Sequence, residues 1–199
     1  PHEILTRLVG SEMCIRDIVD TTAPVIEGGM DAAVECDGAG NLAEYQAWLD
    51  NHAGATASDV CSVPVWSHEE GEFVAACAST GSRSVVFTAT DACGNSASFT
   101  GNFIIEDTTP ASFEGDLQLE FECAEFDMDA SYVTVEDICG DVTLTWVDNE
   151  ISGGCVKPIG RYLRLYTAVD ECGNVSQYEQ SVLLVLSLIH ISEPTRRVR

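Results

Sequence analysis

The sequence has very little basic charge. It contains 9 Lys and Arg residues against 33 Asp and Glu residues, which gives a net charge of −24 at pH 7. Nucleic acids and anionic membranes are bound through basic patches, so we expect neither as a partner. Such acidity is typical of a surface kept soluble by charge or of a protein that binds divalent cations, and the composition leaves both open.

The motifs of common enzyme classes are also missing. The sequence has no Gly-x-Ser-x-Gly elbow, no His-Glu-x-x-His and no glycine-rich phosphate loop. Paired carboxylates are frequent only because the whole chain is acidic, so they do not indicate a glycosidase. We therefore expect a protein that is not an enzyme.

Both ends of the chain resemble translated sequencing adapter. Residues 187–196 (SLIHISEPTR) can be encoded by DNA whose reverse complement, in a shifted frame, encodes residues 8–16 (LVGSEMCIR). Such foreign segments say nothing about the fold. We expect residues 1–17 and 186–199 to be non-native tails on a fragment of a longer protein. The apolar run at 181–191 is too short to span a membrane, so no membrane insertion is expected.

The rest of the chain contains one pattern twice. A turn at 91–95 (DACGN) is followed by an apolar stretch and the linker 106–110 (EDTTP). The turn returns at 170–174 (DECGN), and an earlier copy of the linker stands at 20–24 (DTTAP). Tandem units are typical of modular arrays, in which function belongs to the surface of the array.

The cysteines follow the same division. With Cys14 in the adapter tail, repeat one (18–106) and repeat two (107–185) have four each. They are Cys36, Cys61, Cys77 and Cys93, then Cys123, Cys139, Cys155 and Cys172. Even numbers at matched spacing predict disulfides in an oxidising compartment. Zinc is the alternative, but no Cys-x-x-Cys pair is present and the core histidines, His52 and His68, both lie in repeat one.

Each repeat is predicted to be an all-β, immunoglobulin-like sandwich. A unit of this length fits such a domain, and short apolar or alternating segments bounded by Gly, Asp and Asn indicate strands. Residues 85–89 and 97–105 flank the turn at 91–95 as a hairpin, in which Gly94 supplies a positive φ. Repeat two has matching segments.

Repeat one has an insertion between its first two cysteines. The extra segment, 41–49, has apolar residues at helical spacing and predicts a short helix across one end of the sandwich, with Asn41 as its N-cap. We expect Trp48 and Trp66 to pack in the core. Only an exposed cluster of Tyr45, Trp48 and Trp66 would indicate a binding surface.

Sandwich topology favours one of the three disulfide pairings that four cysteines permit. The second and fourth cysteines of a repeat fall at one end, and the first and third at the other. The predicted disulfides are Cys36–Cys77, Cys61–Cys93, Cys123–Cys155 and Cys139–Cys172.

Three aspartates of each repeat are predicted to meet at one end. They come from the linker, from the position two before the second cysteine and from the last turn: Asp20, Asp59 and Asp91, then Asp107, Asp137 and Asp170. Calcium binds six to eight oxygens held on loops, so these residues are candidate calcium ligands. The alternative is an ordinary turn role, because Asp beside Gly or Asn is common in turns.

The linker 107–110 (DTTP), the strand 87–90 (FTAT) and the turn 91–95 resemble those of hyalin-repeat (HYR-like) immunoglobulin-type domains, which occur in large bacterial surface and secreted proteins. The second copy matches through 166–170 (YTAVD) and 172–174 (CGN). The resemblance implies an immunoglobulin-like fold, an extracellular or bacterial cell-surface location, and a role in adhesion or as a stalk. It implies no catalytic residues.

These observations predict a stalk or spacer of a bacterial adhesin, with neighbouring repeats of the same chain as partners and calcium as the one candidate cofactor. Two alternatives stay open. The repeats themselves could bind a glycan or a cell-surface protein, or they could be accessory modules of an extracellular enzyme.

Overall fold

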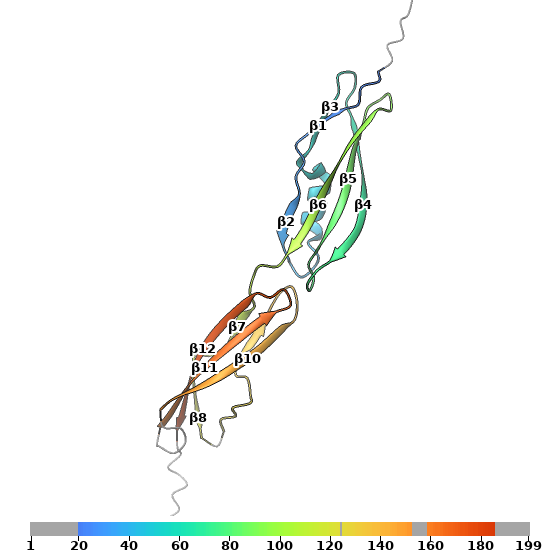
Figure 1. Ribbon diagram of the computed structural model, residues 1–199. Helices are drawn as coiled ribbons and strands as arrows, with labels where there is room; N and C mark the ends of the chain where they lie inside the picture. The colour runs from blue at the N-terminus through green and yellow to red at the C-terminus, as the bar shows by residue number, and fades with distance from the viewer. Residues whose placement is uncertain (1–19, 124, 153–158, 186–199) are drawn as a thin grey trace, which may run out of the picture.

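The computed structural model describes residues 20–123, 125–152 and 159–185. They form two β-sandwiches that lie end to end in an elongated molecule (Figure 1). We call residues 20–106 the first sandwich and residues 107–185 the second sandwich. The predicted class, all-β with two immunoglobulin-like sandwiches and one short helix, is confirmed.

The first sandwich pairs a four-stranded sheet with a two-stranded sheet. The larger sheet has the order β2 (Ala32–Glu35), β6 (Ser96–Glu106), β5 (Gly81–Thr90) and β4 (Val65–Ala75). The smaller sheet pairs β1 (Val25–Glu27) with β3 (Thr56–Ser58). Strand β2 runs parallel to β6, whereas the other pairs are antiparallel. Helix α1 (Leu42–Asp50) and the short 3-10 helix η1 (His52–Gly54) connect β2 to β3.

The second sandwich repeats this arrangement without the helix. Its larger sheet has the order β10 (Val142–Ser152), β11 (Ile159–Asp170), β12 (Val175–Val185) and β8 (Gln118–Glu122), with β8 parallel to β12. Its smaller sheet pairs β7 (Ser112–Glu114) with β9 (Thr134–Glu136). The predicted tails, 1–17 and 186–199, lie outside the described residues.

The predicted hairpins form because their apolar residues alternate. In β5, Val85, Phe87 and Ala89 are fully buried while Val86 between them is exposed, which is the period of a strand with one buried face. Strand β6 pairs antiparallel with β5 and places Phe99 opposite Phe87. The turn between them is closed by Gly94, whose φ is 92°.

The insertion forms the predicted helix, but its position and its cap differ from expectation. Asn41 has a φ of 51° and makes no capping bond; its Nδ2 donates to the Glu35 carbonyl oxygen at 2.8 Å instead. The helix packs on the face of the four-stranded sheet and not across one end of the sandwich. Tyr45 and Trp48 turn toward the sheet because both rings contact Phe103, with centroids 5.1 and 5.6 Å apart.

The second sandwich fills the corresponding space with polar side chains. Arg164 of β11 is fully buried, and its Nε and Nη2 donate to the two carboxylate oxygens of Asp148, both at 2.6 Å. Burial lowers the pKa of Arg164, but the interactions with Asp148 and then Tyr166 outweigh it, so the net shift raises this pKa above its already high value. Gln180 of β12 is also fully buried and donates to the Asp116 carbonyl at 2.7 Å. The buried side chains of Arg164 and Gln180 thus both have hydrogen-bond partners, as burial of a polar group requires.

Candidate functional site: the junction between the sandwiches

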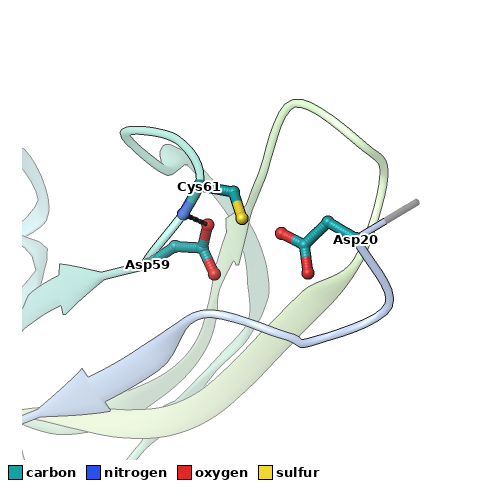
Figure 2. A group of neighbouring side chains, drawn as sticks. All are labelled: Asp20, Asp59 and Cys61. Atoms are coloured by element: carbon teal, nitrogen blue, oxygen red, sulfur yellow. Dashed lines mark hydrogen bonds between the residues drawn. The ribbon is translucent and has the colours of Figure 1, made fainter. Parts of the chain in front are cut away.

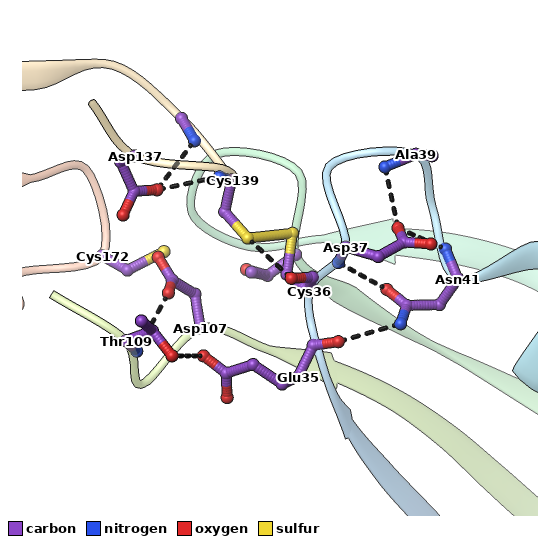
Figure 3. Close-up of a disulfide and its surroundings, with 12 residues drawn as sticks. Glu35, Cys36, Asp37, Ala39, Asn41, Asp107, Thr109, Asp137, Cys139 and Cys172 are labelled. Atoms are coloured by element: carbon purple, nitrogen blue, oxygen red, sulfur yellow. Dashed lines mark hydrogen bonds between the residues drawn. A yellow bond between two sulfur atoms is a disulfide. The ribbon is translucent and has the colours of Figure 1, made fainter. Parts of the chain in front are cut away.

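Two disulfides cross the junction between the sandwiches. They are Cys36–Cys139, which Figure 3 shows, and Cys77–Cys172, with Cα atoms 5.9 and 5.2 Å apart. The predicted pairs Cys36–Cys77 and Cys139–Cys172 are therefore wrong in this structure. Cys36 and Cys77 lie at one end of the first sandwich, and Cys139 and Cys172 at one end of the second, as expected. The pairing differs because the two ends face each other, which places a sulfur of the other sandwich within bonding reach.

The remaining cysteines are not placed alike. Cys61 and Cys93 are exposed and are the free cysteines of the part of the chain that the structure describes, so the predicted Cys61–Cys93 bond is also wrong here. Cys123 is disulfide-bonded. Its predicted partner, Cys155, lies outside the described residues.

The Cys36–Cys139 disulfide extends the core of the first sandwich across the junction. Cys36 and Cys139 are 4% and 3% exposed, and they form one buried cluster with Phe103 and Ile105 of β6. A residue of the second sandwich is thereby part of the apolar core of the first. Burial of this bond restricts relative motion at the junction more than an exposed bond would, because bending there must also disturb close packing.

The linker is held by a single carboxylate of the first sandwich. Glu35, at the end of β2, accepts hydrogen bonds from the Thr108 backbone N–H at 2.8 Å and from the Thr108 and Thr109 hydroxyls at 2.9 and 2.7 Å. The Thr109 hydroxyl is the main cause that lowers the pKa of Glu35, followed by the Thr108 backbone N–H and hydroxyl. Figure 3 shows Glu35 beside Thr109 and the disulfide. The linker is therefore an ordered part of the junction.

Backbone contacts complete the junction. The Ser79 N–H of the first sandwich donates to the Cys139 carbonyl of the second at 3.2 Å. Gly38 has a φ of 73° and lies so close to the Ile138 carbonyl oxygen that a Cβ would collide with it. A residue other than glycine at position 38 would push the sandwiches apart, so the contact depends on this residue.

Two of the predicted calcium ligands lie side by side at the junction. One carboxylate oxygen each of Asp107 and Asp137 and the sulfur of Cys139 all lie within 4.8 Å of one another. The sulfur is part of a disulfide and therefore cannot bind a metal. Asp107 Oδ2 is buried and has no hydrogen-bond partner among the described residues. Burial raises the pKa of Asp107, and the charges of Asp137 and Asp170 raise it further, against the Thr109 N–H, which lowers it. A cation would relieve this repulsion.

The third predicted ligand at this end, Asp170, has a role in the hairpin turn. It is 6% exposed, and its Oδ1 accepts hydrogen bonds from the N–H groups of Cys172 and Asn174, both at 2.9 Å. Its Oδ2 is buried and unpartnered within the described chain. Burial raises the pKa of Asp170, but its hydrogen bonds, chiefly those from Asn174, outweigh this and lower it. Asp170 therefore stabilises the turn through Oδ1, while Oδ2 has no hydrogen bond from the described residues and is available as a metal ligand.

Asp91 occupies the same turn position in the first sandwich but keeps no free oxygen. Its Oδ1 accepts from the N–H groups of Cys93 and Asn95 at 2.8 Å, and its Oδ2 accepts from Asn95 Nδ2 at 2.7 Å. The side-chain hydrogen bond from Asn95 is the main cause that lowers the pKa of Asp91. The structure thus favours the turn role over the metal role for this residue.

Asp20 and Asp59 form the counterpart cluster at the far end of the first sandwich, together with the Cys61 thiol (Figure 2). The Cys61 N–H donates to Asp59 Oδ1 at 2.9 Å. A hydrogen bond to Asp20, and then the negative charge of Asp20, raise the pKa of the Cys61 thiol. Cys61 is therefore held as a thiol and is a poor metal ligand at neutral pH.

The aromatic residues predicted as weak binding candidates are parts of the core. Trp48 contacts Phe87 at 5.2 Å between ring centroids, and its Nε1 donates to the Met30 carbonyl at 3.3 Å. Tyr45 and Trp66 are half-buried against the same apolar cluster. The exposed aromatic cluster that would have favoured a glycan site is not formed by these three residues.

Sequence reasoning missed Glu35 and Ser79 as junction residues. For Glu35 a signal exists, because the dipeptide Glu-Cys recurs as residues 122–123 at the corresponding strand end of repeat two. Ser79 acts through its backbone N–H, for which the sequence offers no signal.

Comparisons with known proteins give remote structural likenesses. No family model and no curated protein sequence matches the chain. Among solved structures, a Drosophila N-cadherin EC1-4 fragment is 12% identical with a TM-score of 0.35, covering 83% of this chain and 50% of that chain. Human mucin-like protocadherin EC1-2 is 8% identical with a TM-score of 0.36, covering 82% and 98%. This chain thus spans about half the length of the N-cadherin fragment. Likeness at this level says nothing about function, and the hyalin-repeat resemblance stays a prediction.

Proposed function

We propose that the chain is a non-catalytic, extracellular repeat module that acts as a stalk or spacer in a bacterial cell-surface adhesin of the hyalin-repeat type. The observation that carries this proposal is the double disulfide across the junction. Two covalent bonds, an ordered linker and backbone contacts hold successive sandwiches end to end. Such a junction fixes the orientation of one sandwich relative to the next, and a spacer needs this to hold another domain at a set distance.

The extracellular part of the proposal rests on redox chemistry. Disulfides form and persist in oxidising compartments and are rare in the cytosol. The net charge of −24 favours solubility and repels anionic surfaces. In the described part of the chain no helix is long and apolar enough to cross a membrane.

A small-angle scattering experiment tests the stalk. The oxidised chain is expected to give a distance distribution of a single elongated particle, because the junction is fixed at several points. The variant Cys139→Ser/Cys172→Ser, which keeps both sandwiches but removes both bonds, is expected to give a broader distribution. A flexible oxidised chain, indistinguishable from the variant, would contradict a rigid spacer.

We include calcium in the proposal as the cation of the junction. Asp107 and Asp137 supply neighbouring carboxylates, and Asp170 has a buried oxygen without a partner. Carboxylate oxygens on loops suit a hard cation such as Ca²⁺, which also accepts backbone oxygens and water as further ligands. Bound there, it would neutralise charge that otherwise opposes docking.

The substitution Asp107→Asn separates the two roles of this carboxylate. Because the folded-state pKa of Asp107 is raised, its ionised form destabilises the fold; the stability that this group contributes is present at low pH and is lost as pH rises through that pKa. In chelator at pH 7 the variant is therefore expected to melt above the parent chain. In calcium the order is expected to reverse, because a cation at one hundred times its dissociation constant adds about 2.7 kcal/mol to the parent alone.

Thermal unfolding of the oxidised chain in calcium and in excess chelator provides the measurement. Asp116→Asn, an exposed aspartate of the same sandwich away from the cluster, is the control and should respond to calcium as the parent does. A parent midpoint that is equal in calcium and chelator would remove calcium from the proposal and leave the disulfides as the stiffening device.

A binding role is the second candidate, and one observation favours it. A small pocket on the first sandwich is lined by Leu42, Tyr45, Phe73 and Arg83, of which Leu42 and Phe73 are exposed apolar side chains. Screening the chain against a glycan array, with Phe73→Ala as the comparison, tests whether this pocket takes a sugar ring. An accessory role beside an extracellular enzyme is tested by sequencing the flanking gene.

A further inference from the structure

We infer that the far end of the first sandwich, where Cys61 and Cys93 lie, is a docking surface for the cysteine-bearing end of a preceding sandwich. Cys61 and Cys93 would form two disulfides there, as Cys139 and Cys172 do at the observed junction. This inference rests on the proposed function, because it assigns a neighbour in the same array.

The two cysteines stand in the same local geometry as the pair that is bonded. Asp59 Oδ1 accepts from the N–H groups of Cys61 and Ser62 at 2.9 and 3.0 Å. In the second sandwich, Asp137 Oδ1 accepts from the N–H groups of Cys139 and Gly140 at 2.8 and 3.2 Å. The loop that presents the second cysteine is therefore the same structure in both sandwiches.

The turns that present the fourth cysteine of each sandwich, Cys93 and Cys172, also have the same local structure. In the turn that presents Cys93 and in the turn that presents Cys172, the aspartate Oδ1 accepts the same two backbone hydrogen bonds. In each turn the asparagine side chain also reaches the linker, since Asn95 Nδ2 donates to the Asp20 carbonyl and Asn174 Nδ2 to the Asp107 carbonyl, both at 3.1 Å. Both cysteines and the start of the linker thus form one surface that occurs twice in the chain.

At the observed junction the two cysteines of this surface are covered, since Cys139 is 3% exposed and Cys172 is half-buried, whereas Cys61 and Cys93 at the far end are exposed. Thr108 and Thr109 are exposed, as their counterparts Thr21 and Thr22 are, and their hydroxyls and the Thr108 N–H donate to Glu35. Val60 is 98% exposed and its counterpart, Ile138, is 66% exposed, with its carbonyl oxygen directed at Gly38. The far end therefore presents thiols, hydroxyls and an apolar side chain in the arrangement that the observed junction uses.

These groups define the partner by its chemistry. It carries a Glu-Cys pair at the end of a strand, as Glu35 and Cys36 do, and a second cysteine placed as Cys77 is. Each of the two bonds forms from two thiols that lose two protons and two electrons to a disulfide oxidant, which is reduced to two thiols. Oxidised glutathione supplies this chemistry in the experiment.

A chain extended by one repeat tests the inference. A copy of residues 20–106 is inserted directly before Asp20 of the complete chain, with Cys61→Ser and Cys93→Ser in the copy, so that every signal from these two cysteines belongs to the original sandwich. After oxidation, unreacted thiols are labelled with a maleimide and peptides are mapped without reduction. We expect Cys36–Cys61 and Cys77–Cys93 peptides in the monomer, and complete loss of labelling at Cys61 and Cys93.

Three controls make the result decisive. The parent chain under the same oxidant should give no peptide linked through Cys61 or Cys93, whose thiols are then either labelled or carried as glutathione adducts. A copy that also carries Cys36→Ser and Cys77→Ser should behave as the parent does, and copies that keep only one of these cysteines test each bond alone. Labelled thiols in the extended chain, or a Cys61–Cys93 peptide in either chain, would overturn the inference. If the thiols stay free but scattering still shows one rigid elongated particle, the docking surface fails while the stalk stands.

Discussion

The first sandwich fills its centre with apolar and aromatic side chains, whereas the second places a buried arginine at the corresponding point. Val85 and Arg164 both stand six residues before the aspartate of the last turn, and both are fully buried. Gly101 and Gln180 correspond in the same way, six residues after the asparagine of that turn. The difference follows from the helix, which is present only in the first sandwich.

Helix α1 needs the space that the second sandwich gives to polar side chains. A Cβ on Gly101 would stand 2.9 Å from the Trp48 ring, so the glycine is what lets the helix approach the sheet. Without a helix, the second sandwich surrounds Arg164 with the rings of Phe126, Tyr132 and Trp146, 5.2 to 5.5 Å from its guanidinium carbon. The comparison teaches that the ends of the repeat are constant while its centre can be built in two ways.

The largest expected effect comes from Arg164→Ala. The change leaves the Asp148 carboxylate buried without its partner, so we expect the free energy of unfolding to fall by about 3–5 kcal/mol. The matched control is Arg83→Ala, which breaks a half-exposed ion pair with Glu70 in the first sandwich and should cost about 0–1 kcal/mol. Denaturant unfolding of the oxidised chain measures both.

Two results would bear on this account of the core. The double variant Arg164→Leu/Asp148→Leu should recover part of the loss, because it leaves no buried charge unpaired. An Arg164→Ala variant that is no less stable than Arg83→Ala would show that the buried pair does not organise the second sandwich.

An intermediate loss of stability is expected when Gly101 of the first sandwich is replaced by glutamine, the residue at the corresponding position 180 of the second. Gly101→Gln places a side chain where Trp48 packs, and overpacking of this kind costs about 1–3 kcal/mol. Thr100→Gln, one residue earlier and exposed on the other face of β6, should change stability by less than about 0.5 kcal/mol. Equal effects of the two changes would mean that the helix does not depend on this glycine.

The smallest effect concerns the two copies of the docking end. The Cys61 thiol is held protonated by Asp20, so Asp20→Asn is expected to lower its pKa and to shift the pH profile of its alkylation to lower pH. Peptide-resolved labelling against pH measures the shift, with Cys93 in the same molecule as the internal standard. An unchanged profile for Cys61 would mean that Asp20 does not control this thiol.

The sandwich fold could be predicted from the sequence because its signals are local. Alternation in 85–89 and the glycine at position 94 determine a strand and its turn without reference to the rest of the chain. The inserted helix could be predicted for the same reason, although its place on the sheet could not, since that depends on the rings of Phe87 and Phe103.

The disulfide pairing could not be predicted, because it depends on how two units meet. Local topology places Cys36 and Cys77 at one end, and nothing in either repeat states that the next repeat brings two more cysteines to the same place. Arg164 did carry a signal that was overlooked. It stands two residues before Tyr166 and four before Ala168, on the same inward face of β11. Because every second residue of a strand faces the same side, this spacing alone indicates that Arg164 is buried.

The central claim is that disulfides join one sandwich to the next, and disulfide mapping tests it most directly. The oxidised chain is digested without reduction by a protease that cleaves at acidic residues, which are plentiful between its cysteines, and the linked peptides are identified by mass spectrometry. The account predicts Cys36–Cys139 and Cys77–Cys172 peptides. Recovery of Cys36–Cys77 and Cys139–Cys172 peptides in their place would contradict it.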